Sequence, residues 1–224
     1  MASKKEASEM AVLLINNYVR EADRKIKRYL EALKALTDER IDVMRFCDVK
    51  PDMELPKDVK AIILSGSEAY LSRLEDRLFF EDLLAFIRKA NTPLLGICFG
   101  HQLIALAFGA EVVSMRQTLK EPKEVVVEEP DEIFSSWRRG DKLLVAEWHS
   151  DEVAKLPEGF VRLASSDYCA IEAMKHVERP VYGVQFHPER RPADWPSREP
   201  WHGLYVLYNF LDLSGVTARR PKPL

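Results

Sequence analysis

The sequence predicts an α/β fold in which a mostly parallel central sheet is flanked by helices on both faces and carries a small antiparallel extension. In the first half, short β-branched apolar runs alternate with longer runs of helical periodicity, which is the pattern of strand–helix–strand units. In the second half, several short strand-like runs follow one another with few helical stretches between them, which favours antiparallel pairing.

The expected elements follow in chain order. The first half should contain strands at 10–15, 41–46, 59–64 and 93–98, and helices at 21–36, 71–88 and 100–108, the last one stopped by Gly109. The second half should contain strands at 124–127, 142–146, 160–164, 170–174 and 181–185, and a final helix at 204–211. Sites in open α/β sheets lie at the carboxyl ends of the parallel strands, so functional residues are expected there.

The composition of the chain is that of one generous globular domain. Of its 224 residues, 46% are hydrophobic and 31% are charged, which is enough apolar material for a sizeable core. We expect a single domain at 10–214, a disordered N-terminus at 1–9 and a flexible basic tail at 215–224. The net charge of −3 gives no electrostatic reason to expect nucleic acid or an anionic membrane as a partner.

Three cysteines, Cys47, Cys98 and Cys169, are too few for a disulfide framework, and the N-terminus lacks the apolar stretch of a secretory signal. No apolar run is long enough to cross a bilayer. These features predict a soluble protein of the cytoplasm. Nothing in the sequence around Cys47 or Cys169 suggests chemistry, so both are expected in the core.

Cys98 has different surroundings. It lies between an apolar strand and a helix, with Gly96 two residues before it and Gly100 two residues after it. A tight strand-to-helix turn needs small neighbours to present a nucleophile above the sheet, and the helix N-terminus favours the thiolate. The alternative is an ordinary buried cysteine whose glycine neighbours serve packing.

A base for this thiol is available later in the chain. An apolar strand ends at His187, and Glu189 follows two residues later, where it can face the same way and orient the imidazole. The combination of nucleophile, base and orienting carboxylate makes His187 a better catalytic candidate than the other four histidines.

These residues resemble the class I glutamine amidotransferases. The family pattern Gly-x-Cys-x-Gly-His-Gln matches residues 96–102, and its second pattern, Gln-Phe-His-Pro-Glu, matches residues 185–189. The resemblance implies a flavodoxin-like α/β fold with Cys98 as nucleophile, His187 as acid and base, and Glu189 as its partner. It implies L-glutamine as the substrate, hydrolysed through a cysteinyl thioester, with no metal or other cofactor.

The resemblance also implies an oxyanion hole. The backbone N–H of Phe99 is one candidate donor, and the glycine loop containing Gly66 and Ser67 should supply the other. Many members of the family have a second glycine and then proline where this chain has Ser67 and Glu68. If the donor must adopt a positive φ, serine is strained there and glycine is not, which leaves open whether the hole is preformed.

A third segment, 147–153, resembles the border of the glutamine pocket in free-standing amidotransferases. The resemblance assigns pocket roles to His149 and Asp151, while the plainer interpretation is a capped loop with a solvated aspartate. Gln102 is either a pocket residue or a polar residue in the first turn of its helix. The Pro-, Trp- and Arg-rich stretch 190–202 departs from the family, and either covers the site, docks a partner or tethers the final helix.

The leading functional hypothesis is a glutaminase that passes ammonia to a separate synthetase subunit. Neither a Gly-x-x-x-x-Gly-Lys loop nor a Ser-Gly-Gly-x-Asp-Ser loop occurs, so ATP chemistry must lie on another polypeptide. The stretch 169–176 resembles the separately encoded glutaminase subunit of GMP synthetase, which favours conversion of XMP to GMP. A γ-glutamyl hydrolase or peptidase of the same fold and a non-catalytic regulatory relative remain alternatives, and the oligomeric state is open.

Overall fold

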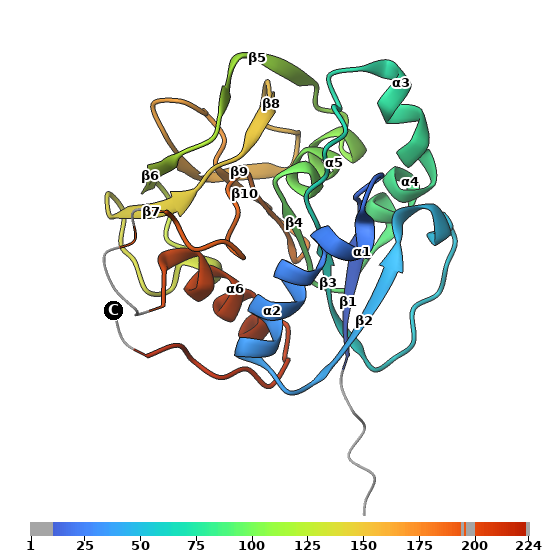
Figure 1. Cartoon of the computed structure of the whole chain (residues 1–224), viewed down its shortest axis with the longest axis horizontal. Coiled ribbons are helices and arrows are strands. Elements are labelled where there is room, and N and C mark those ends of the chain that lie inside the picture. The colour runs from blue at the N-terminus through green and yellow to red at the C-terminus, as the bar shows by residue number, and fades with distance from the viewer. Residues whose placement is uncertain (1–10, 194, 196–199, 223–224) are drawn as a thin grey trace, which may run out of the picture.

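The central element of the computed structural model is a nine-stranded sheet with the order β2-β1-β3-β4-β11-β10-β9-β6-β7 (Figure 1). The structure describes residues 11–193, 195 and 200–222. The parallel strands are β1 (Ala11–Asn16), β2 (Arg40–Arg45), β3 (Val59–Leu64), β4 (Leu94–Ile97) and β11 (Val181–Val184). The antiparallel strands are β10 (Ala173–His176), β9 (Phe160–Ser165), β6 (Pro122–Val127) and β7 (Lys142–Ala146). The predicted fold class is thereby confirmed.

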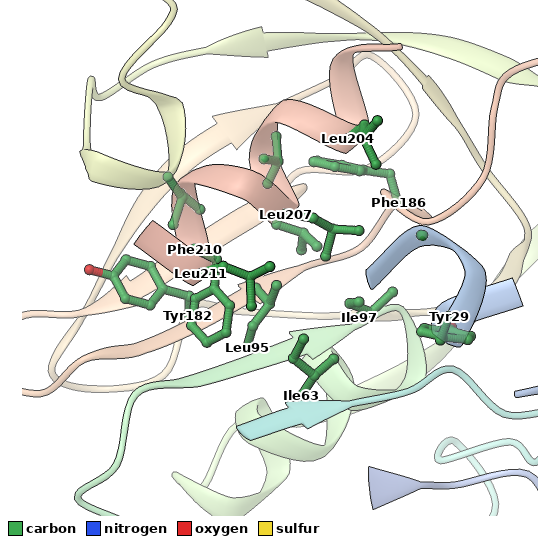
Figure 2. Close-up of a cluster of buried hydrophobic side chains, with 14 of the residues drawn as sticks. Tyr29, Ile63, Leu95, Ile97, Tyr182, Phe186, Leu204, Leu207, Phe210 and Leu211 are labelled. Atoms are coloured by element: carbon green, nitrogen blue, oxygen red, sulfur yellow. The ribbon is translucent and has the colours of Figure 1, made fainter. Parts of the chain in front are cut away.

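Helices cover both faces of this sheet because its buried strands are apolar on both sides. Val12 and Leu14 of β1 point into one core, and Leu13 and Ile15 point into the other. On the first face lie α1 (Ala22–Lys25), α2 (Lys27–Leu36) and α6 (His202–Leu213), and Figure 2 shows side chains of α6 packed over β4 and β3. On the second face lie α4 (Glu81–Lys89) and α5 (Phe99–Ala107), preceded by α3 (Leu74–Arg77). Within the described ranges, no helix is long and apolar enough to cross a membrane.

The expected elements differ from the observed ones mainly in two helices and two strands. The helix expected at 21–36 is divided at Ile26, and the helix expected at 71–88 begins only at Leu74 and contains a 3-10 turn at 78–80. Two strands, β5 (Val112–Leu119) and β8 (His149–Val153), were not expected. They pair antiparallel as a separate small sheet next to α5 (Figure 1).

The ends of the chain bear on two further expectations. Residues 1–9, expected to be disordered, lie outside the described residues. The C-terminal stretch packs against α2 up to Arg219: Val216 is buried, and the Arg219 backbone N–H and guanidinium donate hydrogen bonds to the carbonyls of Leu36 and Lys34. The free carbonyls at the end of α2 thus find a partner in Arg219.

The three cysteines differ in their exposure to solvent. Cys169 is buried, as expected. Cys98 is buried as well, but Cys47 is exposed on the 3-10 turn at 46–48 that follows β2. The neighbouring Phe46 fills the core in its place, so the assignment of Cys47 to the core was wrong.

Candidate active site

Cys98 occupies a strained turn between β4 and α5. Its backbone has φ 53° and ψ −102°, and its N–H donates a hydrogen bond of 2.8 Å to the carbonyl of Val184 at the end of β11. Among the described non-glycine residues, only Cys98 and Glu21 have a positive φ. Such a conformation costs roughly 1–3 kcal/mol and persists only when the surrounding structure enforces it. The turn therefore presents the thiol at the carboxyl ends of the parallel strands.

The two glycines that flank this turn permit close backbone approaches. A Cβ at position 96 would lie 2.4 Å from the carbonyl oxygen of Gly100, and a Cβ at position 100 would lie 2.5 Å from the carbonyl oxygen of Leu64. Gly96 thus lets the first turn of α5 fold back over β4. Gly100 lets the same turn rest directly against the end of β3.

His187 and Glu189 meet the thiol from the loop after β11. Nδ1 of His187 donates a hydrogen bond of 2.8 Å to Oε1 of Glu189, and the imidazole also contacts the Cys98 thiol. The backbone N–H of His187 is bound to the carbonyl of Ala146 at 2.8 Å, which fixes the base against the end of β7. The carbonyl of Trp148 lies 3.6 Å from Sγ of Cys98 and 3.4 Å from Nε2 of His187. The structure therefore brings the three expected catalytic side chains together.

The charges of this cluster reinforce one another. Burial alone disfavours the imidazolium, but the negative charges of Glu189 and Cys98 outweigh it and raise the pKa of His187 to about 10. Burial also disfavours the Glu189 carboxylate, yet the adjacent His187 lowers the pKa of Glu189 below its usual value. At neutral pH the histidine is therefore protonated and ion-paired with Glu189.

The loop after β3 faces the N-terminus of α5. Its Gly66 N–H donates a hydrogen bond of 2.8 Å to the Tyr29 hydroxyl and is therefore already engaged. The Gly66 carbonyl accepts a hydrogen bond of 2.9 Å from the Ser65 hydroxyl. Because the peptide is trans, the N–H of Ser67 points the opposite way from that carbonyl. Ser67 lines a cavity together with Cys98 and Phe99.

These contacts revise the expected oxyanion donors. The N–H of Phe99 is in the first turn of α5, where no carbonyl of the helix can accept its proton. Phe99 and Ser67 therefore both line the cavity, whereas the Gly66 N–H is bound to the Tyr29 hydroxyl. The backbone of Ser67 does not have a positive φ, so the strain considered for serine at this position does not arise.

The cavity in front of Cys98 has a volume of about 130 Å³. Gln102 reaches its wall and donates hydrogen bonds to the carbonyl of Asp151 at 2.7 Å and to Oε1 of Gln185 at 3.1 Å. The Asp151 carboxylate accepts hydrogen bonds from the N–H and the hydroxyl of Ser72 at 2.8 and 2.9 Å. Asp151 is 3% exposed, so the interpretation as a solvated aspartate was wrong. Nothing in the sequence pointed to Ser72 or Tyr29.

Comparison with known proteins bears on the identity of this site. Residues 13–198 match the family model of the class I glutamine amidotransferases ("Glutamine amidotransferase class-I"). The chain belongs to this family. Together with the sheet order, this confirms the resemblance seen in the two motifs and identifies an enzyme of the glutamine amidotransferase type.

Similar proteins cover most of this amidotransferase. A glutamine-hydrolyzing subunit of GMP synthase from Pyrococcus furiosus is 42% identical over 156 residues, covering 70% of this chain and 76% of the relative. The corresponding GMP synthase subunit from Methanosarcina barkeri is 36% identical over 209 residues, covering 92% and 97%. A crystal structure of a putative GMP synthase subunit from Thermoplasma acidophilum has a TM-score of 0.73 at 25% identity and covers 92% of this chain and 94% of that chain.

Near His187, the amidotransferase buries a pair of carboxyl groups that sequence reasoning did not find. Glu147 adjoins Glu172, and its Oε2 lies 3.3 Å from Nε2 of His149. Burial raises the pKa of Glu147 to about 7, and burial together with Glu147 raises that of Glu172 well above its usual value. At least one carboxyl group of this pair is therefore protonated at neutral pH. His149 is neutral because burial lowers its pKa.

Part of stretch 190–202, which departs from the family pattern, lies beside the active site. The Arg190 guanidinium stacks 4.7 Å from the centre of the half-exposed Trp148 ring, and Nε1 of Trp201 donates a hydrogen bond of 2.8 Å to the carbonyl of Pro188. Residues 194 and 196–199 lie outside the described residues. The alternatives of a cover, a docking segment or a tether therefore stay predictions.

Proposed function

We propose that this chain hydrolyses L-glutamine to glutamate and ammonia through a thioester on Cys98, and that the ammonia passes to a separate synthetase subunit that converts XMP to GMP. One observation carries the proposal. The Cys98 thiol, on its strained turn, contacts the ion pair of His187 and Glu189 at the base of a cavity.

The first half of the reaction forms the thioester. The Cys98 sulfur attacks the side-chain carbonyl carbon of glutamine, and the electron pair moves onto the oxygen, where the N–H groups of Phe99 and Ser67 can bind it. When the tetrahedral intermediate collapses, the C–N bond breaks and His187 donates its proton to the departing nitrogen, which leaves as ammonia. Glu189 keeps the imidazole oriented and stabilises its charge before the transfer.

The second half regenerates the enzyme. The now neutral His187 accepts a proton from a water molecule, whose oxygen attacks the thioester carbonyl. The C–S bond then breaks, glutamate leaves, and the sulfur of Cys98 is again paired with the protonated His187. In this scheme Gln102, His149 and Asp151 shape the pocket: Gln102 ties α5 to β8, and Asp151 anchors Ser72 from the opposite wall.

The acceptor reaction is inferred from the relatives. Proteins that this chain matches over most of their length are named as one subunit of glutamine-hydrolyzing GMP synthase, and a protein named in this way works with a partner. These names support L-glutamine as the substrate, and they support consumption of the ammonia by a synthetase subunit.

Ammonia release from glutamine tests the proposal. It should be measured with and without ATP, XMP and the synthetase subunit, using Cys98→Ala as the blank. Ammonia release that Cys98→Ala lacks, together with GMP formation from glutamine in the complex, is the expected result. Hydrolysis of γ-glutamyl peptides in preference to glutamine would overturn the substrate, and ammonia release by Cys98→Ala would overturn the nucleophile.

A further inference from the structure

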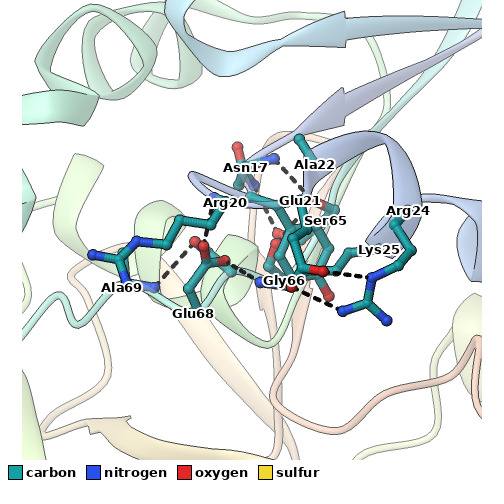
Figure 3. A network of polar contacts seen from close by, with 12 residues as sticks. Asn17, Arg20, Glu21, Ala22, Arg24, Lys25, Ser65, Gly66, Glu68 and Ala69 are labelled. Atoms are coloured by element: carbon teal, nitrogen blue, oxygen red, sulfur yellow. Dashed lines mark hydrogen bonds and ion pairs between the residues drawn. The ribbon is translucent and has the colours of Figure 1, made fainter.

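A single side chain fastens the downstream end of the loop that carries Ser67. We call residues 65–68 the oxyanion loop. Oε1 of Glu68 accepts a hydrogen bond of 2.6 Å from the backbone N–H of Arg20, and its Oε2 lies 3.2 Å from Nζ of Lys25 (Figure 3). Arg20 lies just before α1, and Lys25 is the last residue of α1. The Glu68 side chain is 33% exposed and that of Lys25 is 23% exposed, so the contact is partly sheltered from water.

The upstream end of the oxyanion loop is held separately. The Asn17 backbone N–H donates to the Ser65 hydroxyl at 2.9 Å, and its side-chain amide donates to the Ser65 carbonyl at 2.7 Å. Gly66 is held by the Tyr29 hydroxyl. Ser67, which lines the cavity, therefore lies between an upstream anchor buried in the core and a downstream anchor made by Glu68.

The backbone is strained next to Arg20, the residue whose N–H Glu68 binds. Glu21 has φ 50° and directly follows Arg20, whose N–H is bound by Glu68. A left-handed conformation in a non-glycine residue costs roughly 1–2 kcal/mol. The Glu21 side chain does not account for it, because it is mostly exposed and pairs only locally, with Arg24. The contact with Glu68 joins Arg20, the neighbour of this strained residue, to the oxyanion loop, as the hydrogen bonds between Asn17 and Ser65 do further upstream.

We propose that Glu68 is a positioning residue for the oxyanion hole, which holds the Ser67 N–H at its working place by clamping the oxyanion loop to the start of α1. The inference rests on the proposed glutaminase function. Glu68 touches neither the thiol nor the imidazole in the contacts described above. Its loss should therefore weaken stabilisation of the oxyanion while leaving the nucleophile intact.

Three variants divide the clamp into its parts. Glu68→Ala removes both contacts, Glu68→Gln keeps an acceptor for the Arg20 N–H but loses the charge, and Lys25→Met removes only the ion pair. Since deletion of an oxyanion donor costs about 10²–10³ in kcat, partial misplacement by Glu68→Ala should lower kcat by about 10- to 100-fold. A partly exposed ion pair is weak, so Lys25→Met and Glu68→Gln should lower kcat by about two- to fivefold. KM should stay within about threefold throughout.

The matched control is Glu21→Gln. It breaks the ion pair between Glu21 and Arg24 on the same turn, a pair that does not involve the oxyanion loop. This variant should keep the kcat of the wild type. Thermal unfolding of every variant shows whether it is folded at the assay temperature. If Glu68→Ala does not fold, the test is made with Glu68→Gln, which keeps the size and shape of the side chain.

Two chemical probes distinguish a defect in the oxyanion hole from a defect in the Cys98 thiol. Iodoacetamide alkylation, followed at Cys98 itself because Cys47 is also free and exposed, reports on the Cys98 thiol. Inactivation by a diazoketone analogue of glutamine also requires a carbonyl oxygen in the oxyanion hole. In Glu68→Ala, inactivation by the diazoketone should slow by the same factor as kcat, and alkylation should proceed at the wild-type rate. Raising KCl to 1 M should lower kcat in the wild type but not further in Glu68→Ala, because salt screens the ion pair.

The outcomes are separable. Unchanged kcat in Glu68→Ala, equal losses in Glu21→Gln, or a parallel loss of iodoacetamide reactivity would overturn the positioning role. If wild-type protein neither releases ammonia nor reacts with the diazoketone, the proposed function itself fails. If the wild type does both and Glu68→Ala equals it, only the role of Glu68 fails.

Discussion

Gly100 sets the distance between the nucleophile turn and the oxyanion loop, and its replacement by alanine tests that geometry. The new Cβ would lie 2.5 Å from the carbonyl oxygen and 2.7 Å from Cβ of Leu64, where ordinary contacts begin at 3.4 Å. The first of these neighbours is backbone, which no change of rotamer can relieve. The first turn of α5 and the end of β3 must therefore move apart by a distance on the order of 1 Å, and misplacement of this size costs about 10²-fold in rate.

The expected result is a kcat for glutamine hydrolysis that is lower by about 100-fold, because Phe99 on α5 and Ser67 after β3 separate. Overpacking of this kind costs about 1–3 kcal/mol, which for a chain of this length lowers Tm by about 2–4 °C per kcal/mol. Steady-state ammonia release at 25 °C, well below Tm, measures the effect on catalysis. A parallel thermal melt measures the effect on stability.

Gly109→Ala provides the comparison. Gly109 lies at the other end of α5 with φ 84°, and a Cβ there would meet no atom within 4 Å. Alanine is strained in this conformation by roughly 1–2 kcal/mol, so this variant loses a comparable amount of stability without moving the active site. Its kcat should equal that of the wild type. If Gly100→Ala keeps kcat within about threefold of the wild type, or if both variants lose activity equally, the spacing argument is wrong.

Three further expectations follow from the buried polar groups. Glu189→Gln removes the charge that keeps the pKa of His187 near 10, so the alkaline limb of the pH–rate profile should move to lower pH; a limb that stays in place would count against the ion pair. Ser72→Ala removes the hydroxyl that donates to the buried Asp151 carboxylate and keeps the backbone N–H donor, at a cost of about 1–3 kcal/mol. It should raise KM for glutamine by about fivefold or more, whereas an unchanged KM would remove Asp151 from the pocket wall. Burial raises the pKa of Glu172 in the folded state, so above the usual carboxyl pKa the folded protein binds more protons than the unfolded protein. The Tm of the wild type should therefore fall between pH 5 and pH 8, and Glu172→Gln should reduce that fall.

The fold was predictable where local patterns and tertiary environment agree. The strand at 59–64 was predicted with its true bounds because all of its residues except Lys60 are apolar, and it is buried on both faces between two helical layers. β5 and β8 were not predictable in this way. Both are short on apolar residues, and they are strands because they pair with each other beside α5, a contact made between distant parts of the chain.

The same distinction applies to the candidate site. Cys98, His187 and Glu189 could be found because each lies in a short motif whose spacing has a local meaning. The surrounding contacts come from elsewhere in the chain: Tyr29 holds Gly66, and Ser72 holds Asp151. The hydrogen-bond partner of a single hydroxyl or carboxyl group cannot be predicted from sequence periodicity.

The oxyanion loop shows how this limits the interpretation of a departure from the family pattern. From the sequence, serine and glutamate in place of glycine and proline suggested strain at Ser67. In the structure Ser67 is unstrained, and the positive φ values fall instead on Cys98 and Glu21. These two residues lie on either side of the loop, at the turn that presents the nucleophile and at the turn that Glu68 clamps. With glutamate in place of proline, the position of the oxyanion loop therefore depends on a side-chain contact and not on the backbone of the loop. Salt can screen that contact and a point mutation can remove it, whereas salt does not change the backbone restriction that a proline imposes.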